Sequence, residues 1–152
     1  MAGRVLKVYL AASMRGGGEG KGYDALRELA CLVEDLGHIP MNEVCWERAP
    51  LVKAKGKGDD HLYNRDMAWL KMADCLIADI TYPSLGVGYE VAVAIREQKI
   101  PVLGLYHRSV KDLSAMFNGN TEPLFHIESY SDTNDIQDLV RRFLGRIAKP
   151  KV

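Results

Sequence analysis

An α/β fold with a parallel sheet is predicted by three features of the sequence. Apolar, β-rich segments alternate along the chain with segments whose apolar residues recur at helical spacing. Glycine-rich or polar loops separate these segments, and the 152 residues suffice for one domain with a sizeable core. Strands that alternate with helices imply a parallel sheet with helices on both of its faces. We therefore expect a single domain over residues 1–152.

The first two strands and the helix between them are predicted from their apolar pattern and from the residues at their ends. Val5–Ala12 is largely apolar and rich in β-forming residues, which suits a buried strand. Tyr23–Leu36 carries an apolar stripe at helical spacing, and Gly37 follows it as a natural C-cap. Ile39–Cys45 is expected to form a second, short strand.

The middle of the chain contains a loop, a helix and a central strand. Lys53–Asp60 is rich in lysine and glycine and predicts a mobile loop. Asp59 or Asp60 is expected to cap the next helix, which runs to about Ala73. Cys75–Ile80 is an apolar run typical of a central strand.

The second half continues the alternation, and Ser84 stands where an N-cap belongs. The predicted elements are a largely apolar, buried helix over Gly86–Gln98, a strand over Pro101–Tyr106, a short helix over Asp112–Phe117, an edge strand over Phe125–Tyr130 and a closing amphipathic helix over Asp132–Ile147. In such a sheet the ligand binds outside the carboxyl ends of the strands. The loops after Ala12, Ile80 and Tyr106 are therefore the expected site.

Composition excludes several classes of partner and cofactor. Twenty basic side chains balance twenty acidic ones, so nothing favours a nucleic acid or an anionic membrane as partner. No apolar run approaches the length of a membrane span, and we expect a cytoplasmic protein. The cysteines, Cys31, Cys45 and Cys75, are odd in number and form no C-x-x-C pair, which predicts reduced, buried thiols. The histidines show no metal-ligand spacing, so we expect neither a metal nor an organic cofactor.

A glycine-rich loop follows the first predicted strand, over Ser13–Gly18. Glycines before a helix let the backbone approach a phosphate, and free amides at this place bind anions. Arg15 can hold a phosphate through two hydrogen bonds. A flexible surface loop is the alternative, because neither the G-x-G-x-x-G nor the Walker spacing is present.

Glu90 is the strongest candidate for a catalytic residue. It falls within the first two turns of a predicted helix, where the helix dipole favours the ionised carboxylate. Gly86 and Gly88 leave the first turn open to a ligand. An ionised carboxylate beside an anion site is what a glycosidase nucleophile needs. In the alternative, Glu90 faces solvent as part of a capping arrangement.

Asp66 and Tyr9 could join Glu90. Asp66 falls on the apolar stripe of its predicted helix, where a carboxylate is costly unless it is paired or used. A salt bridge to Arg65 is the alternative to a catalytic role. Asp66 and Glu90 precede and follow the same predicted strand, and paired carboxylates perform glycoside-type hydrolysis. For Tyr9, in the first strand, composition alone favours a core aromatic over a functional role.

Together these residues resemble the 2′-deoxynucleoside 5′-phosphate N-hydrolases, a branch of the nucleoside 2-deoxyribosyltransferase family. The motifs that carry the resemblance are Tyr9-x3-Ser13-x-Arg15-Gly16-Gly17, Asp66-x2-Trp69-Leu70-x2-Ala73-Asp74, Pro83-Ser84-Leu85-Gly86-Val87-Gly88-Tyr89-Glu90 and Leu113-Ser114-Ala115-Met116. The third is an unbroken string of eight residues and is the most specific. The resemblance implies a flavodoxin-like or Rossmann-like domain that works as a homodimer on a nucleotide substrate.

The resemblance also implies roles for single residues. Glu90 would attack C1′ of the deoxyribose and form a glycosyl-enzyme ester, with Asp66 orienting Glu90 or assisting departure of the base and Tyr9 beside the sugar. The residues implied around the 5′-phosphate are Ser13, Arg15, Gly16, Ser84, Gly86 and, from the partner subunit, Ser114. The implied products are the free base and 2-deoxyribose 5-phosphate.

One position bears on the substrate and another departs from the family. Transferases that act on free nucleosides tend to have a carboxylate where this chain has Ser84, and a serine hydroxyl can donate to a phosphate that a carboxylate would repel. Asn42-Glu43-Val44 stands where a histidine near the base is expected in animal members, which leaves the preferred base open. A deoxyribosyltransferase, a CMP-type ribonucleotide N-glycosidase and a nucleotide-binding regulator with an inactive site are the alternatives.

Overall fold

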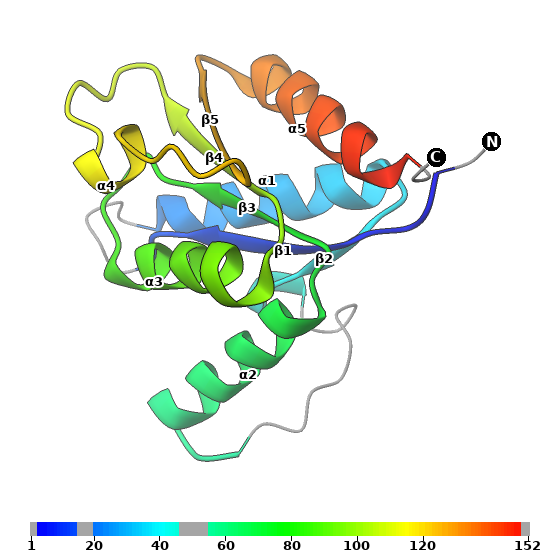
Figure 1. The fold of residues 1–152 in the computed structure, drawn as a ribbon, viewed down its shortest axis with the longest axis vertical. Coiled ribbons are helices and arrows are strands. Elements are labelled where there is room, and N and C mark those ends of the chain that lie inside the picture. The colour runs from blue at the N-terminus through cyan, green and yellow to red at the C-terminus, as the bar shows by residue number, and fades with distance from the viewer. Residues whose placement is uncertain (1–2, 15–19, 46–54, 150–152) are drawn as a thin grey trace.

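The computed structural model describes residues 3–14, 20–45 and 55–149 and confirms the α/β class (Figure 1). One sheet contains five strands, all paired in parallel, in the order β2-β1-β3-β4-β5. The strands are β1 (Lys7–Ala12), β2 (Ile39–Met41), β3 (Cys75–Asp79), β4 (Val102–His107) and β5 (Phe125–Tyr130). This is the flavodoxin-like order, in which the direction of winding reverses between β1 and β3.

Helices cover both faces of the sheet, as Figure 1 shows. They are α1 (Lys21–Asp35), α2 (Asp59–Met72), α3 (Leu85–Val93), α4 (Ala115–Asn118) and α5 (Thr133–Ala148), with a π-helical continuation of α3 over Ala94–Gln98 and a 3-10 turn, η1 (Glu43–Cys45). α1 and α5 pack on one face, and α2 and α3 pack on the other. The predicted order of strands and helices is confirmed, with ends that shift by a few residues.

Alternation along β1 decides which side chains reach each face. Val8, Leu10 and Ala12 pack with α1 and α5 in one hydrophobic core. Tyr9 and Ala11 point to the opposite face and pack with α2 and α3 in a second core. Successive side chains of a strand point to opposite faces, so Tyr9 must lie on the side of the sheet that carries Asp66 and Glu90.

Two local predictions are wrong. The strand over Ile39–Cys45 ends at Met41, because the Asn42 side chain accepts a hydrogen bond from the Val44 backbone at 2.9 Å and turns the chain into η1. Neither Asp59 nor Asp60 caps α2. The N-cap is Gly58, at φ 60°. The two aspartates lie in the first turn, where their negative charges interact favourably with the positive end of the helix dipole.

Four other predictions hold only in part. The short helix expected over Asp112–Phe117 is confined to the four residues of α4. Leu85 and Tyr89 on α3 are exposed, so this helix is buried on one side only. Cys75 is buried, whereas Cys31 is exposed on α1. Residues 55–58 of the predicted Lys53–Asp60 loop lie outside helices and strands, and residues 53–54 are outside the described ranges.

Gly22 allows α1 to start directly against the end of β1. A Cβ atom at this position would lie 1.9 Å from the backbone oxygen of Ser13. No side chain can relieve this contact, because the opposing atom belongs to the backbone. Any larger residue must therefore move the N-terminus of α1 away from the loop that follows β1.

Replacing Gly22 by alanine should destabilise the protein by about 1–3 kcal/mol or more, the usual cost of forcing extra atoms into a packed region. Gly145→Ala is the matched control, since Gly145 lies in α5 and a Cβ there meets no atom within 4 Å. That change should stabilise by about 0.5–1 kcal/mol, because alanine favours the helix. Urea unfolding measures both. Equal stability of the two variants would show that α1 can shift freely.

Candidate active site

The parallel register of β1 and β3 brings their following loops together. Ala12 pairs with Asp79 at the ends of the two strands. Beyond them the Ser13 hydroxyl donates to the backbone oxygen of Pro83 at 3.2 Å and joins the two loops. Ser13 is 4% exposed. The loops that were expected to bind phosphate therefore meet at the carboxyl edge of the sheet, although Arg15 and Gly16 lie outside the described residues.

The N-terminus of α3 is capped by Ser84, as predicted. The Ser84 hydroxyl oxygen accepts from the Val87 backbone at 3.3 Å, and the Ser84 carbonyl accepts from Gly88 at 3.1 Å. The amides of Leu85 and Gly86 belong to the first turn, where a helix offers donors with no intrahelical acceptor. A Cβ on Gly86 would meet only the Ser84 hydroxyl, at 3.8 Å. A ligand can therefore approach the backbone closely here.

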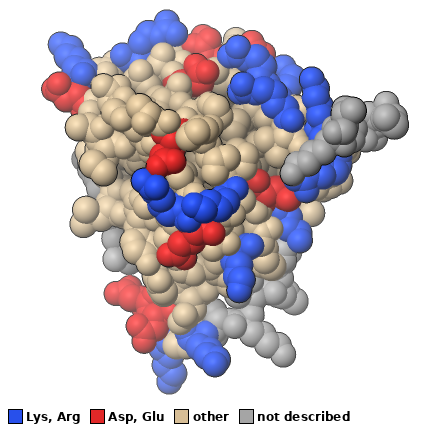
Figure 2. Space-filling model, in the orientation of Figure 1, with Lys and Arg blue, Asp and Glu red and all other residues tan. Residues whose placement is uncertain are grey.

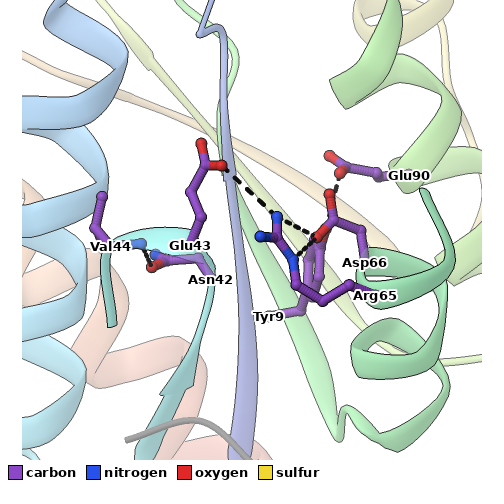
Figure 3. A network of polar contacts seen from close by, with 7 residues as sticks. All are labelled: Tyr9, Asn42, Glu43, Val44, Arg65, Asp66 and Glu90. Atoms are coloured by element: carbon purple, nitrogen blue, oxygen red, sulfur yellow. Dashed lines mark hydrogen bonds and ion pairs between the residues drawn. The ribbon is translucent and has the colours of Figure 1, made fainter. Parts of the chain in front are cut away.

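Tyr9 and Glu90 form a hydrogen bond across the interface of sheet and helix. The Tyr9 hydroxyl donates to Glu90 Oε1 at 2.8 Å, and Tyr9 is 3% exposed (Figure 3). Burial, with the carboxylates of Glu90 and Asp66, raises the pKa of Tyr9 well above 10. The phenol therefore keeps its proton and acts as a permanent donor to Glu90.

Burial raises the pKa of Glu90 to about 7, although the Tyr9 hydrogen bond lowers it. The nearby carboxylates of Asp66 and Glu43 raise this pKa further, and Arg65 opposes them. The expectation that the helix dipole keeps Glu90 ionised therefore needs correction, because burial raises the pKa of Glu90 more than the Tyr9 hydrogen bond and Arg65 lower it. With a pKa of about 7, Glu90 is protonated in part of the molecules near neutral pH.

Asp66 lies beside Tyr9 and Glu90 and is also paired with Arg65. Arg65 contacts Asp66 Oδ1 through Nε at 2.9 Å and through a terminal nitrogen at 2.8 Å. Burial raises the pKa of Asp66, and Arg65 opposes the shift. The predicted meeting of Asp66 with Glu90 and the alternative of an Arg65 ion pair are thus both present (Figure 3).

Sequence reasoning missed the contact of Glu43 with Arg65 and a pair of tyrosines that joins α2 to α3. Glu43, from η1, lies 3.6 Å from Arg65. Tyr63 of α2 hydrogen-bonds Tyr89 of α3 through their hydroxyls at 3.0 Å, with both side chains about half exposed. The helical spacing of Tyr63 and Asp66 could have placed these two on one side of α2. The family resemblance places Asn42-Glu43-Val44 near the base, but no local signal in the sequence pairs Glu43 with Arg65.

A cavity of about 210 Å³ opens at the same sheet edge, on the side of α1. Its lining includes Ser13, Lys21, Asp79, His107 and Tyr130. Glu90, Asp66 and Tyr9 do not line it, because they lie on the opposite face of the sheet. Within it the Tyr130 hydroxyl donates to Asp79 at 2.8 Å, which satisfies the buried part of that carboxylate. The candidate catalytic centre is therefore the Tyr9–Asp66–Glu90 cluster.

The apolar side chains of the segment around Ser114 are divided between the surface and the core. Ser114 is exposed ahead of α4, and Met116 is 82% exposed. Leu113 and Phe117 instead pack against the core of their own chain, with the Phe117 ring stacked on Phe125 at 5.8 Å. The hydrophobic side chain that this segment offers to a partner is therefore Met116.

Charges are dispersed over the surface in view. Figure 2 shows lysine and arginine side chains interspersed with aspartate and glutamate on this face. In the described part of the chain no three histidine, cysteine, aspartate or glutamate side chains gather as metal ligands. Among the same residues no helix has both the length and the apolar character needed to cross a membrane.

Comparison with known proteins identifies relatives over most of the chain. A protein of Thermofilum pendens, provisionally named 2′-deoxynucleoside 5′-phosphate N-hydrolase 1, is 34% identical over 131 residues, which cover 86% of this chain and 89% of the relative. The 5-hydroxymethyl-dUMP N-hydrolase of Mus musculus is 32% identical over 90% of this chain and 78% of its own length. The Danio rerio protein of that name is 28% identical over 95% and 99%. No model of a protein family matches.

The fold also occurs in solved structures. The CMP N-glycosidase of Clostridium botulinum superimposes with a TM-score of 0.67 at 16% identity, over 90% of this chain and 98% of the other. A conserved protein of Enterococcus faecalis gives a TM-score of 0.59 at 18% identity, over 92% and 99%. At these identities the likeness concerns the fold.

The raised pKa of Glu90 makes a prediction about stability. A pKa raised from 4.5 to about 7 means that the folded state binds a proton more tightly than the unfolded state. The free energy of unfolding should therefore fall as pH rises through this window and stay reduced above it. Glu90→Gln buries no charge, so it should exceed the wild type by about 2–3 kcal/mol near pH 8 and match it near pH 4.

Urea unfolding at the two pH values measures this difference. Glu97→Gln, at an exposed position in the segment that continues α3, is the control. It should change stability by no more than about 0.5 kcal/mol at either pH. A Glu90→Gln protein that gains nothing at high pH would mean that water or an unrecognised cation solvates this carboxylate.

Proposed function

The chain belongs to the 2′-deoxynucleoside 5′-phosphate N-hydrolase family, and we propose that it hydrolyses the N-glycosidic bond of 2′-deoxynucleoside 5′-monophosphates. The products are the free base and 2-deoxyribose 5-phosphate. The observation that carries the proposal is the placement of Glu90. This carboxylate lies on the first turns of a helix with an accessible N-terminus, bound by Tyr9 at 2.8 Å and adjacent to Asp66.

Glu90 is the nucleophile in the proposed mechanism. Tyr9 holds Oε1, so Oε2 is the oxygen that approaches C1′ of the sugar. As the Oε2–C1′ bond forms, the C1′–N bond breaks and its electron pair leaves with the base, which takes up a proton. Water then attacks C1′ of the glycosyl ester, and the bond to Glu90 breaks to release the sugar phosphate. Asp66 orients Glu90 or assists the departure of the base.

The 5′-phosphate is bound where the two loops meet. The Ser84 hydroxyl oxygen accepts from Val87, so its own proton remains available for a phosphate oxygen. The amides at the start of α3 add donors at the positive end of the helix dipole. Ser13, Gly86 and the loop residues Arg15 and Gly16 complete the proposed phosphate site. No metal or organic cofactor is included, since two carboxylates and a water suffice for this chemistry.

A homodimer is proposed as the active unit, with Ser114 reaching the phosphate of the partner subunit. Three exposed apolar side chains support an interface at this end of the molecule: Leu85 at 97%, Met116 at 82% and Tyr89 at 51% exposure. They belong to α3, which begins at the carboxyl end of the sheet, and to α4, which lies at that end (Figure 1). The exposed and the buried free cysteine fit a reducing compartment, and we place the enzyme in the cytoplasm.

The substrate class is tested by incubating the protein with each deoxy- and ribonucleotide and measuring free base by chromatography. Deoxynucleoside monophosphates should release base, and the corresponding nucleosides should react at least about a hundredfold more slowly, because each charge-assisted hydrogen bond contributes about 1.5–3 kcal/mol. Glu90→Ala should lower the rate by several orders of magnitude. Ser84→Asp should impair turnover of the monophosphate by repulsion.

Four results would contradict this assignment. Near-normal hydrolysis by Glu90→Ala would exclude this residue as nucleophile. Equal rates of hydrolysis of deoxyguanosine and its monophosphate would show that the protein has no functional phosphate site. Faster release of base from ribonucleotides would show that the enzyme is a ribonucleotide N-glycosidase. Transfer of the sugar to an added base in preference to water would show that it is a deoxyribosyltransferase.

The shared site predicts complementation between two inactive variants. A Glu90→Ala chain carries an intact Ser114, and a Ser114→Ala chain carries an intact Glu90. After subunit exchange, each hybrid dimer contains one site with both residues, so activity should exceed the sum of the separate proteins. The measurement requires that Ser114→Ala alone is clearly impaired. Additive activity after demonstrated exchange, or sedimentation as a monomer at working concentration, would rule out the shared site.

A further inference from the structure

Arg65 occupies the centre of the carboxylate cluster and is held from three directions. Its guanidinium contacts Asp66 Oδ1 at 2.9 and 2.8 Å and lies 3.6 Å from Glu43 Oε2. The Cζ atom of the guanidinium lies 4.8 Å from the centre of the Trp69 ring. Only 18% of the Arg65 side chain is exposed, unlike a surface cation that samples many conformations. Figure 3 shows Arg65 between Glu43 and Asp66.

This arrangement does not follow from helix geometry alone. Neighbouring residues of a helix point about 100° apart, so Arg65 and Asp66 do not face each other by default. Trp69 is one turn further along α2, where its ring can support the Arg65 side chain. Glu43 comes from η1 and lies 3.6 Å from the guanidinium, on the side away from Asp66 (Figure 3). Two residues from outside the Arg65–Asp66 pair therefore determine its geometry.

Both Arg65 contacts with Asp66 end on the same oxygen. Oδ1 accepts from Nε and from a terminal nitrogen, and these two charge-assisted contacts hold this oxygen in place. Oδ2 is thereby left as the oxygen that can face a substrate. Without Arg65, the half-buried carboxylate of Asp66 could rotate, and its charge would have no compensating partner within the described cluster.

We propose that Arg65 is a positioning residue of the active site, which holds Asp66 in one orientation beside Glu90 while Glu43 and Trp69 hold Arg65. The inference rests on the proposed function, because it assigns Asp66 and Glu90 to the hydrolytic site. Arg65 acts through Asp66 and need not touch the substrate. Its guanidinium cannot be replaced by an ammonium, which lacks the paired donors in one plane.

The charges around the two acidic groups give this role a measurable signature. The groups that face them are Tyr9 from β1, Glu43 from η1, Arg65 from α2, and each other. Arg65 lowers the pKa of both Asp66 and Glu90, whereas Glu43 raises the pKa of both. Neutralising Arg65 and neutralising Glu43 must therefore shift the pKa values of Asp66 and Glu90 in opposite directions.

The first test compares the pH dependence of kcat/KM on a deoxynucleoside monophosphate. Arg65→Gln should move the acidic limb to higher pH by about one unit, the size expected of a unit charge a few ångströms away. Glu43→Gln should move the same limb to lower pH. Arg96→Gln, which removes an exposed cation paired with Glu122, is the control and should leave the limb in place. Shifts of equal sign for Arg65→Gln and Glu43→Gln would overturn the proposal.

Arg65→Lys separates position from charge. Lysine keeps the cation, so the acidic limb should return toward that of the wild type. Lysine lacks the planar pair of donors, so it should not hold Asp66 in place. The variant's kcat should therefore stay at least about tenfold below that of the wild type, with KM little changed. Full recovery of both the limb and kcat by lysine would show that Arg65 acts as a charge only and would overturn the positioning role.

A titration without substrate makes the inference independent of the reaction. Carbon NMR can follow the titration of the side-chain carboxyls of Asp66 and Glu90 in the intact protein. Their pKa values should rise in Arg65→Gln and fall in Glu43→Gln. These shifts would stand even if no nucleotide were hydrolysed, in which case the proposed function alone would fail. Unchanged titrations in an active protein would overturn the role of Arg65 alone. If Arg65→Gln fails to fold, Glu43→Gln and Arg65→Lys carry the test.

Discussion

The parallel pairing of β1 with β3 is the constraint on which the site depends. Their register, from Val8 opposite Cys75 to Ala12 opposite Asp79, ends both strands at one level. Because the sheet is parallel, the loop after each strand emerges at that same edge, where the winding direction reverses. Ser13 can then reach the loop before α3, and Tyr9 is presented to the face on which α3 packs.

The cluster on that face is electrostatically costly, and the surrounding apolar packing must offset the cost. Three carboxyl groups, those of Glu43, Asp66 and Glu90, share one guanidinium, that of Arg65. Desolvation is the largest effect on the pKa of Asp66 and of Glu90. Removing carboxylates from water is unfavourable for folding, but in the proposed mechanism it leaves the Glu90 carboxylate poorly hydrated for its attack on the sugar. Stability and reactivity therefore oppose each other at Glu90.

Local patterns in the sequence predicted most of the fold and part of the site. Apolar periodicity located the strands and the helices, and Ser84 was recognised as an N-cap, because these features depend on residues a few positions apart. The ends of elements were less predictable. Asn42 turned the chain out of β2 through its side chain, and Gly58 began α2 in place of an aspartate, since each choice depends on geometry that composition does not contain.

The sequence by itself determined that a carboxylate, Glu90, stands at the start of an apolar helix after a capping serine, and that Asp66 falls on the apolar stripe of another. Only the tertiary structure decided the state of these groups. Burial beneath packed helices set the pKa of Glu90 near 7, and β-strand alternation delivered Tyr9 as its donor. Glu43 and Arg65 met because η1 and α2 flank β1, a contact between residues 22 positions apart. Desolvation and long-range ion pairs arise from packing, and no local pattern encodes them.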